Sequence, residues 1–572
     1  MILQELHDYY RRKSTDPEAG MAPEGMEIKA IPYIIVIDPA GRFVDLQATG
    51  DQIHNRGRSF MVPKSVGRSG KNAWQTAFLF WDHFGYVLGH PKTDTAKDKE
   101  TARRQNETFI KAINDLPADL VTRSDVQAVL NFYLKNESLK VFDHPAWDAC
   151  KRISGCNLTF KIAGDRSILP EKEWVVAHEG EKKEDAQSYG NAYRCLITGK
   201  KEPIQAKQTA TPIPGSKSGA KLVSFQKNSG YDSYGKEQGF NAPISITAEN
   251  GYTTALKTLL SSETNKYLLA GSTFVFWTQR PTGFENDFSL FFKDPPKDNP
   301  DAAVQAIKTL YDSLRTGKFN DQEENRFYLL GLSPNAARIS VRFWKTGTVK
   351  EFAERIRQHF DDLEIIKGKS DREYLALGQL LRATALEYKT GNIPPRLGGD
   401  MVRSIVEGGV YPAVLLNNCM NRVRAERHIN RSRAAILKAY LNRQIRVNKK
   451  NEKELLMSLD RENKNQAYRL GRLFATLEKI QENAQPGINT TIRDRFYSSA
   501  SSNPSSVFPL LMRLKNAHLK KLLPGQQVNH EKEVGEIMDK IEPAIPAHLN
   551  LNEQATFAVG YYHQRQSFYA KK

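Results

Sequence analysis

The chain has 572 residues, 40% apolar and 26% charged, and its 83 Lys and Arg against 65 Asp and Glu give a formal net charge of +18. This composition excludes general disorder, and the length predicts roughly two to four domains. No stretch approaches the roughly 20 apolar residues of a membrane span, residues 1–8 lack a signal-peptide profile, and four cysteines are too few for a disulfide framework. We therefore expect a soluble, multidomain, cytoplasmic protein with no membrane contact, whose dispersed positive charge suits a nucleic acid partner.

Helix and strand patterns alternate in the first part of the chain. Apolar residues recur at helical spacing within residues 3–10. A β-branched run at 31–37, a tight turn and an alternating segment at 42–46 predict an antiparallel hairpin. Residues 98–142 have mostly helical spacing, and 158–162 have a strand pattern.

The middle of the chain contains loops and two further strands. Residues 200–221 are polar and rich in Gly, Pro, Ser and Thr, which predicts a long loop. Apolar runs at 273–277 and 339–344 predict strands, and 287–301 looks like a linker. Beyond Lys350 the apolar positions follow helical spacing.

The sequence therefore predicts an α+β fold, in which a mixed α/β N-terminal body with an antiparallel sheet is followed by an all-helical C-terminal bundle. We expect three parts: the N-terminal body at 1–350, a basic helical region at 351–456 and the C-terminal bundle at 457–572.

Catalytic motifs are missing from the sequence. We find no phosphate-binding loop, zinc-protease or serine-hydrolase motif. Cys150 and Cys156 have no second Cys or His pair at zinc spacing, and Cys195 and Cys419 stand alone. We expect buried structural thiols, no metal and no cofactor, and a protein that is not an enzyme. A nuclease whose scattered carboxylates converge on Mg²⁺ is an alternative.

The first candidate binding segment is 61–75. Its cations can neutralise phosphates, its amides can reach base edges, and its glycines allow close approach to a duplex. The alternative is a solvated surface loop anchored by the apolar run 78–81. The candidate residues are Lys64, Ser65, Arg68, Ser69, Lys71, Asn72 and Gln75.

The second candidate segment is 221–238, where a predicted strand leads into a loop with two tyrosines among cations. Such tyrosines suit stacking on unpaired bases. The alternative is a β-hairpin with core tyrosines. The candidate residues are Lys227, Asn228, Ser229, Tyr231, Tyr234, Lys236 and Gln238.

The third candidate is a basic helix over 421–450, with ten Lys or Arg against Glu426 alone. A solvated helix face normally mixes signs, so this bias favours contact with phosphates. The candidates within it are Arg422, Arg424, Arg427, Arg431, Arg433 and Arg443.

Short motifs in a fixed order along nearly the whole chain resemble the large-subunit family of the type I-C CRISPR Cascade surveillance complex (the Csd family). These motifs lie at residues 1–6, 31–36, 222–225, 233–238, 241–243, 252–256, 330–338, 340–344, 438–443 and 468–474. The resemblance rests on their shared order rather than on any single motif.

The resemblance implies a non-catalytic subunit in antiviral defence. Such a subunit recognises the protospacer-adjacent motif in duplex DNA, aids duplex opening and stabilises the R-loop. The implied partners are a guide RNA (crRNA), the target double-stranded DNA and its displaced strand, the backbone and guide-end processing subunits, a small subunit, and a helicase-nuclease recruited on target binding.

The resemblance also suggests that residues 457–572 can be made separately, from an internal start at Met457, as the small subunit. The alternative is that Met457 is simply a core residue. If this part resembles the small subunit, further cations within it would line the path of the DNA strands: Arg469, Arg472, Arg493, Arg495, Lys515, Lys520 and Lys521.

Two alternative functions are considered. The chain could be a structural RNA-binding scaffold that holds the guide end without reading DNA. It could also be a metal-dependent nuclease.

Overall fold

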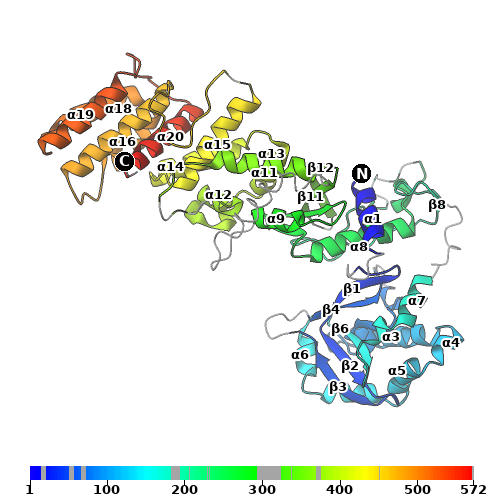
Figure 1. Ribbon diagram of the computed structural model, residues 1–572. Coiled ribbons are helices and arrows are strands. Elements are labelled where there is room, and N and C mark those ends of the chain that lie inside the picture. Colours follow the sequence, from blue (N-terminus) through cyan, green and yellow to red (C-terminus); the bar gives the residue numbers. More distant parts are fainter. Residues whose placement is uncertain are drawn as a thin grey trace. The chain divides into compact units, whose positions relative to one another are not determined.

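The computed structural model describes residues 1–14, 21–50, 57–65, 68, 72–181, 193–204, 206–227, 230, 232, 234–292, 324–336, 338–368, 371, 375–449 and 451–569 (Figure 1). The chain divides into two compact units. The first contains Met1–Pro212, Ser216–Thr258 and Ala336–Arg338, and the second Ile213–Gly215, Leu259–Asn335 and Ile339–Lys572. The predicted boundaries at 350 and 457 both fall inside the second unit. The predicted α+β class is confirmed.

The first unit contains a four-stranded sheet in the order β3-β2-β6-β5. Its strands are β2 (Tyr33–Ile37), β3 (Phe43–Ala48), β5 (Trp81–His83) and β6 (Asn157–Ile162). The predicted hairpin is confirmed, because β2 and β3 pair antiparallel with Ile35 opposite Leu46. However, β2 also pairs parallel with β6, so the sheet is mixed rather than antiparallel throughout.

Strand β2 is buried on both faces, which explains why all five of its residues are apolar. On one face, Ile35 packs in a core with Phe109, Phe132 and Phe160. On the other face, Ile34 and neighbouring side chains pack against the antiparallel pair β1 (Met26–Ile31) and β4 (Arg58–Pro63).

Helices and short strands complete the first unit. Helices α3 and α5 supply the core residues Phe109 and Phe132 on one face of the sheet. The helices are α1 (Ile2–Lys13), α2 (Phe84–Val87), α3 (Ala96–Asn114), α4 (Ala118–Val121), α5 (Ser124–Leu134), α6 (Trp147–Arg152) and α7 (Glu173–Glu181), with β7 (Tyr193–Arg194), β8 (Lys201–Glu202) and most of α8 (Ile246–Ser261).

The second unit begins with a four-stranded sheet in the order β12-β11-β10-β9. The strands are β9 (Lys266–Leu269), β10 (Ser272–Thr278), β11 (Arg326–Asn335) and β12 (Arg338–Thr348). Phe274, Phe276 and Leu329 on this sheet belong to a core that continues through the helices up to Tyr562.

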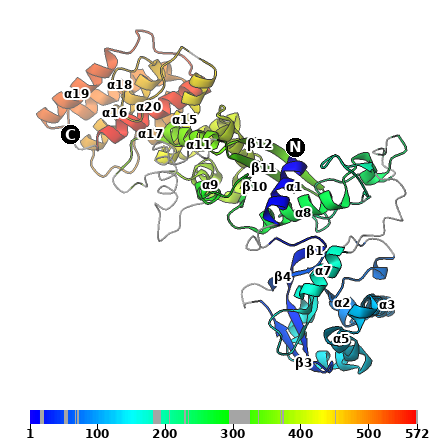
Figure 2. The same cartoon turned by 45° about the vertical axis from the view of Figure 1, so that its right-hand side comes forward.

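The helices that follow are α11 (Val349–Leu363), α12 (Leu377–Ala383), α13 (Leu397–Glu407), α14 (Ala413–Glu426), α15 (Arg431–Val447), α16 (Gln466–Ala484), α17 (Ile492–Ser502), α18 (Pro504–Leu519), α19 (Pro524–Met538) and α20 (Leu551–Ser567). No strand follows Thr348 in the described residues, so the helical C-terminal prediction is confirmed there. Figures 1 and 2 both show α16 beside α20.

Three local predictions are wrong. Residues 221–225 form no strand, and only Lys221 makes an isolated bridge, with Arg338. The predicted linker begins inside helix α9 (Phe284–Phe292), and its remainder lies outside the described residues. The single basic helix is two helices, because Arg427 is left-handed at φ 50° and the Asn430 side chain caps α15 by accepting from the Arg433 amide.

Candidate nucleic-acid interface

The segment after β4 is fastened to the first unit by buried carboxylates. The Lys64 ammonium lies 3.0 Å from Glu249 Oε2, and the Glu249 side chain is fully buried. The Ser65 amide donates to Glu27 Oε1 at 3.1 Å. Burial raises the pKa of Glu27 and the Lys257 ammonium lowers it, with a net shift below the usual range. Lys64 and Ser65 are therefore held by partners inside the protein.

Arg68 anchors this segment to the core. Its guanidinium forms a forked ion pair with Asp82, one bond being 2.9 Å from Nη1 to Oδ1. It also lies 3.6 Å from the ring centre of Phe78 and 4.1 Å from that of Tyr86. The side chain is only 14% exposed. Arg68 was predicted to contact DNA, but its charge is engaged inside the unit, so a structural role fits this placement better.

Asn72 precedes the turn η2 (Ala73–Gln75) and Gln75 is its last residue, and both are exposed. The Tyr86 hydroxyl donates to the Ala73 carbonyl at 2.8 Å, and the Arg104 guanidinium lies 5.5 Å from the Trp74 ring centre. Neither amide has a side-chain hydrogen bond within the described part of the chain. A fixed turn thus presents two free amides to solvent.

Two predicted residues of this segment, Ser69 and Lys71, lie outside the described residues. Three of the four residues of the apolar run 78–81 are buried as predicted, with Leu79, Phe80 and Trp81 at most 6% exposed, whereas Phe78 is half-buried. Trp81 Nε1 donates to the Pro63 carbonyl at 2.9 Å, which ties β5 to the end of β4.

The second candidate segment projects a tyrosine into solvent. The Tyr234 side chain is fully exposed, and its backbone is left-handed at φ 52°. Lys227 pairs with Glu237 at 2.7 Å, while Lys236 is exposed and Gln238 is half-buried. The alternative of a core tyrosine is therefore wrong at Tyr234. Asn228, Ser229 and Tyr231 lie outside the described residues.

Arg433 and Arg443, predicted to contact nucleic acid, lie inside the second unit. Arg433 is fully buried, with donors to the Ala383 carbonyl at 3.0 Å and to Glu426 Oε2 at 2.6 Å. Arg443 Nε donates to Asp362 Oδ2 at 2.6 Å, and this side chain is 1% exposed. These guanidiniums hold neighbouring helices together, so their burial does not favour the predicted contact with nucleic acid at either position.

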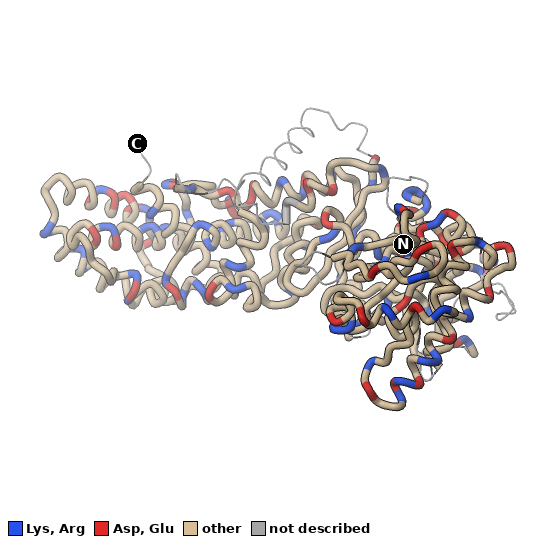
Figure 3. The backbone as a smooth tube through the Cα atoms, turned by 90° about the horizontal axis from the view of Figure 1, so that it is seen from below, with Lys and Arg blue, Asp and Glu red and all other residues tan. Residues whose placement is uncertain are grey.

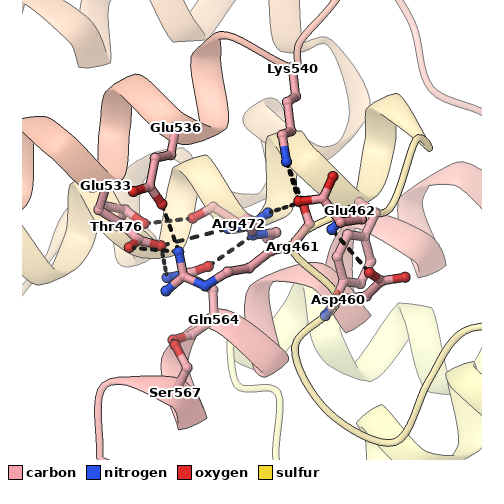
Figure 4. Close-up of polar contacts among 11 residues, drawn as sticks. Asp460, Arg461, Glu462, Arg472, Thr476, Glu533, Glu536, Lys540, Gln564 and Ser567 are labelled. Atoms are coloured by element: carbon pink, nitrogen blue, oxygen red, sulfur yellow. Dashed lines mark hydrogen bonds and ion pairs between the residues drawn. The ribbon is translucent and has the colours of Figure 1, made fainter.

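Arg472 is a third buried guanidinium (Figure 4). It donates to Gln564 Oε1 at 2.9 Å and lies 3.6 Å from Glu533. Exposed Arg461, beside it, pairs with Glu533 and Glu536. The side chain is 2% exposed, so its placement does not favour the predicted contact of Arg472 with a DNA strand.

The remaining predicted cations of the second unit fall into two groups. One group is half-buried and interacts with other residues of the unit: Arg422, Arg424, Arg431, Arg469 and Arg493. The other group has no ion pair among the described residues: Arg427, Arg495, Lys520 and Lys521 are exposed, and Lys515 is half-buried. Figure 3 shows Lys and Arg interspersed with Asp and Glu along the backbone. Positive charge that could meet a phosphate is therefore confined to individual exposed side chains.

The cysteines and carboxylates form no metal site in the described residues. All four cysteines are free and buried, as predicted. No three His, Cys, Asp or Glu side chains gather around a common point in the described part of the chain. Within the same residues, every helix is too short or too polar to cross a bilayer.

Sequence reasoning missed the buried acids that determine where the cations lie. Asp82, Glu249 and Asp362 each neutralise a cation that the sequence marked as a phosphate contact. One signal was available, since Asp82 directly follows the apolar run 78–81 and such a carboxylate needs an internal partner.

A family model described as CRISPR-associated protein (Cas_Csd1) matches residues 6–569. No curated protein matches the chain.

Proposed function

Because the chain belongs to the Cas_Csd1 family of CRISPR-associated proteins, we propose that it is the non-catalytic large subunit of a type I-C Cascade surveillance complex. The match over residues 6–569 carries this proposal, since it runs through both compact units. In this role the chain recognises the protospacer-adjacent motif in duplex DNA, helps to open the duplex and stabilise the R-loop, and docks the helicase-nuclease. Base pairing with the guide RNA reads the rest of the target.

The turn η2 supports a role in reading the flanking motif. The Asn72 and Gln75 amides each carry donors and an acceptor, which is the pattern that base edges match. The contacts of Tyr86 and Arg104 hold this turn in place before any DNA binds. A preformed turn loses less conformational freedom on binding than a flexible loop would.

Exposed cations of the second unit support contact with DNA strands. Arg427, Arg495, Lys520 and Lys521 reach solvent, and such side chains can neutralise phosphates whatever the sequence. The buried guanidiniums are not part of this proposal.

The proposal is tested with the assembled complex on duplexes that share one matched target and differ in the flanking bases. We expect Asn72→Ala and Gln75→Ala to reduce the preference for the correct flanking bases, by about 1–3 kcal/mol for each good base contact. The measurement is a gel shift at constant salt. Gln47→Ala removes an exposed amide from strand β3 and serves as the matched control.

Three results would count against parts of the proposal. Wild-type preference in both variants would exclude η2 as the reader. A wild-type complex that binds all flanking sequences equally would favour an RNA scaffold that reads no DNA. Cleavage of DNA by the purified subunit with Mg²⁺ or Mn²⁺ would favour a nuclease.

A further inference from the structure

A pocket of about 190 Å³ opens in the first unit, where three separate segments meet. Residues 206–208, Lys221, 223–225 and 238–239 line it. Val223 and Phe225 supply apolar walls, and both are half-buried. Pockets for drug-sized ligands are typically about 300–1,000 Å³, so this one suits a single small ring system.

Two ammonium groups border the pocket without a counter-ion. Lys207 is exposed and Lys221 is half-buried, and neither forms an ion pair within the described part of the chain. Burial, and then the neighbouring Lys207 charge, lower the pKa of Lys221. The nearby carboxylate of Glu249 already accepts from Lys64 Nζ at 3.0 Å and from the Thr209 amide at 2.6 Å. Two adjacent cations thus lack a negative partner of their own.

A buried amide in the pocket wall also lacks a partner. Gln208 is 4% exposed, and its Oε1 accepts from the Tyr252 hydroxyl at 2.8 Å. Its Nε2 is buried and has no hydrogen bond. Leaving a buried donor unpaired costs about 1–3 kcal/mol, and an ordered water or a polar atom of a bound molecule would satisfy it.

We propose that this pocket binds one unpaired nucleotide, with its phosphate between Lys207 and Lys221 and its base against Phe225. Base stacking on an aromatic ring and phosphate neutralisation by lysine are the usual elements of single-strand recognition. This inference rests on the proposed function in that a guide RNA or an opened DNA strand supplies the nucleotide.

The test uses the full-length protein and fluorescent pentanucleotides of RNA and DNA, each carrying 5-iodouracil. We expect Lys221→Gln and Lys207→Gln each to weaken binding about tenfold, as loss of a hydrogen bond to a charged group does. Each loss should also flatten the dependence of log affinity on log salt by about 0.7. Photocrosslinking of the bound strand should mark the peptide that contains Phe225.

Lys217→Gln is the matched control, because Lys217 is exposed in the same segment and lies outside the pocket. Thermal melting of each variant checks that it folds as wild type. A loss confined to the RNA or to the DNA identifies the source of the nucleotide, and an equal loss in both supports the shared chemistry.

The inference is overturned if both pocket variants bind like Lys217→Gln, or if crosslinks map only to other peptides. The gel shift with varied flanking bases is run on the same variants. If Lys221→Gln binds pentanucleotides like wild type, and its complex keeps the wild-type preference for flanking bases, the pocket proposal is wrong and the proposed function stands. If the wild-type complex shows no preference among flanking bases, the proposed recognition of the flanking motif is wrong instead.

Discussion

Arg68 and Asp82 form an ion pair in which both side chains are largely withdrawn from water. Removing one partner of such a pair leaves the other charge buried and uncompensated. The guanidinium also fills the space between the rings of Phe78 and Tyr86. The segment that carries Asn72 therefore depends on this pair for its position.

We expect Arg68→Ala and Asp82→Ala each to lower the free energy of unfolding by about 3–5 kcal/mol. The double variant should lose less than the sum, because the two residues share one interaction. Urea unfolding of the full chain measures this. Arg152→Ala removes an exposed guanidinium from the same unit and should change stability by at most about 0.5 kcal/mol. If Arg68→Ala matched that control and still weakened DNA binding, Arg68 would be a DNA contact after all.

Residue type alone identified candidate binding side chains, but it did not show which cations are already paired with a carboxylate inside the protein. The sequence identified Asn72, Gln75 and Tyr234 as candidates, and all three are exposed. It could not separate Arg443 from Arg427, because Asp362, the partner of Arg443, belongs to another helix 81 residues away. Whether the exposed candidates contact nucleic acid stays a prediction.

At the scale of elements, helices α16 and α20 approach each other at two glycines. A Cβ atom at Gly471 would lie 2.1 Å from the Phe557 carbonyl oxygen, and one at Gly560 would lie 2.2 Å from the Tyr468 carbonyl oxygen. Both obstacles are backbone atoms, which cannot rotate away as a side chain can. The close packing of this helix pair therefore requires glycine at both positions.

We expect Gly471→Ala to destabilise the protein by about 1–3 kcal/mol, because overpacking outweighs the gain of roughly 1 kcal/mol in helix propensity. Gly535→Ala is the control, since Gly535 lies in α19 with no atom near the added Cβ. That change should raise stability by up to about 1 kcal/mol. Thermal and urea unfolding of both variants measure the difference, and similar shifts for the two would contradict a tight crossing.

Elements built from neighbouring residues were predicted well, and those built from distant ones were not. The hairpin β2–β3 and helix α16 follow from local periodicity and turn residues. The parallel pairing of β2 with β6 joins residues more than 120 positions apart, and no local pattern specifies it. A clue did exist, since a strand that is apolar at every position is typical of the middle of a covered sheet.

At the scale of the whole molecule, the position of Met457 bears on the separate small subunit that the family resemblance suggests. Met457 is 48% exposed, between α15 and α16, so the alternative that it is a core residue is wrong. Its carbonyl accepts from the Ile366 amide at 2.7 Å. A chain that began there would contain helices α16 to α20, which pack on one another.

We expect expression of the intact coding sequence to yield a second product that begins at Met457. Met457→Leu should abolish this product and leave the full-length chain unchanged, because translation can no longer start there. Intact-mass measurement of the purified material identifies both species. Met512→Leu is the control, since it removes a methionine inside α18. A shorter product that survives Met457→Leu would contradict the internal start.

Helix α20 packs against both α15 and α16 and fills the interior of their bundle. The ribosome makes α20 after all the helices that surround it. From the end of α15 at Val447 to the end of α20 at Ser567 there are 120 residues (567 − 447). At about 5–20 residues per second, their synthesis takes about 6–24 s. During that interval α15, and α16 once it is made, leave exposed the apolar surfaces that α20 later covers, and in that time the nascent polypeptide is most vulnerable to aggregation and most dependent on chaperones.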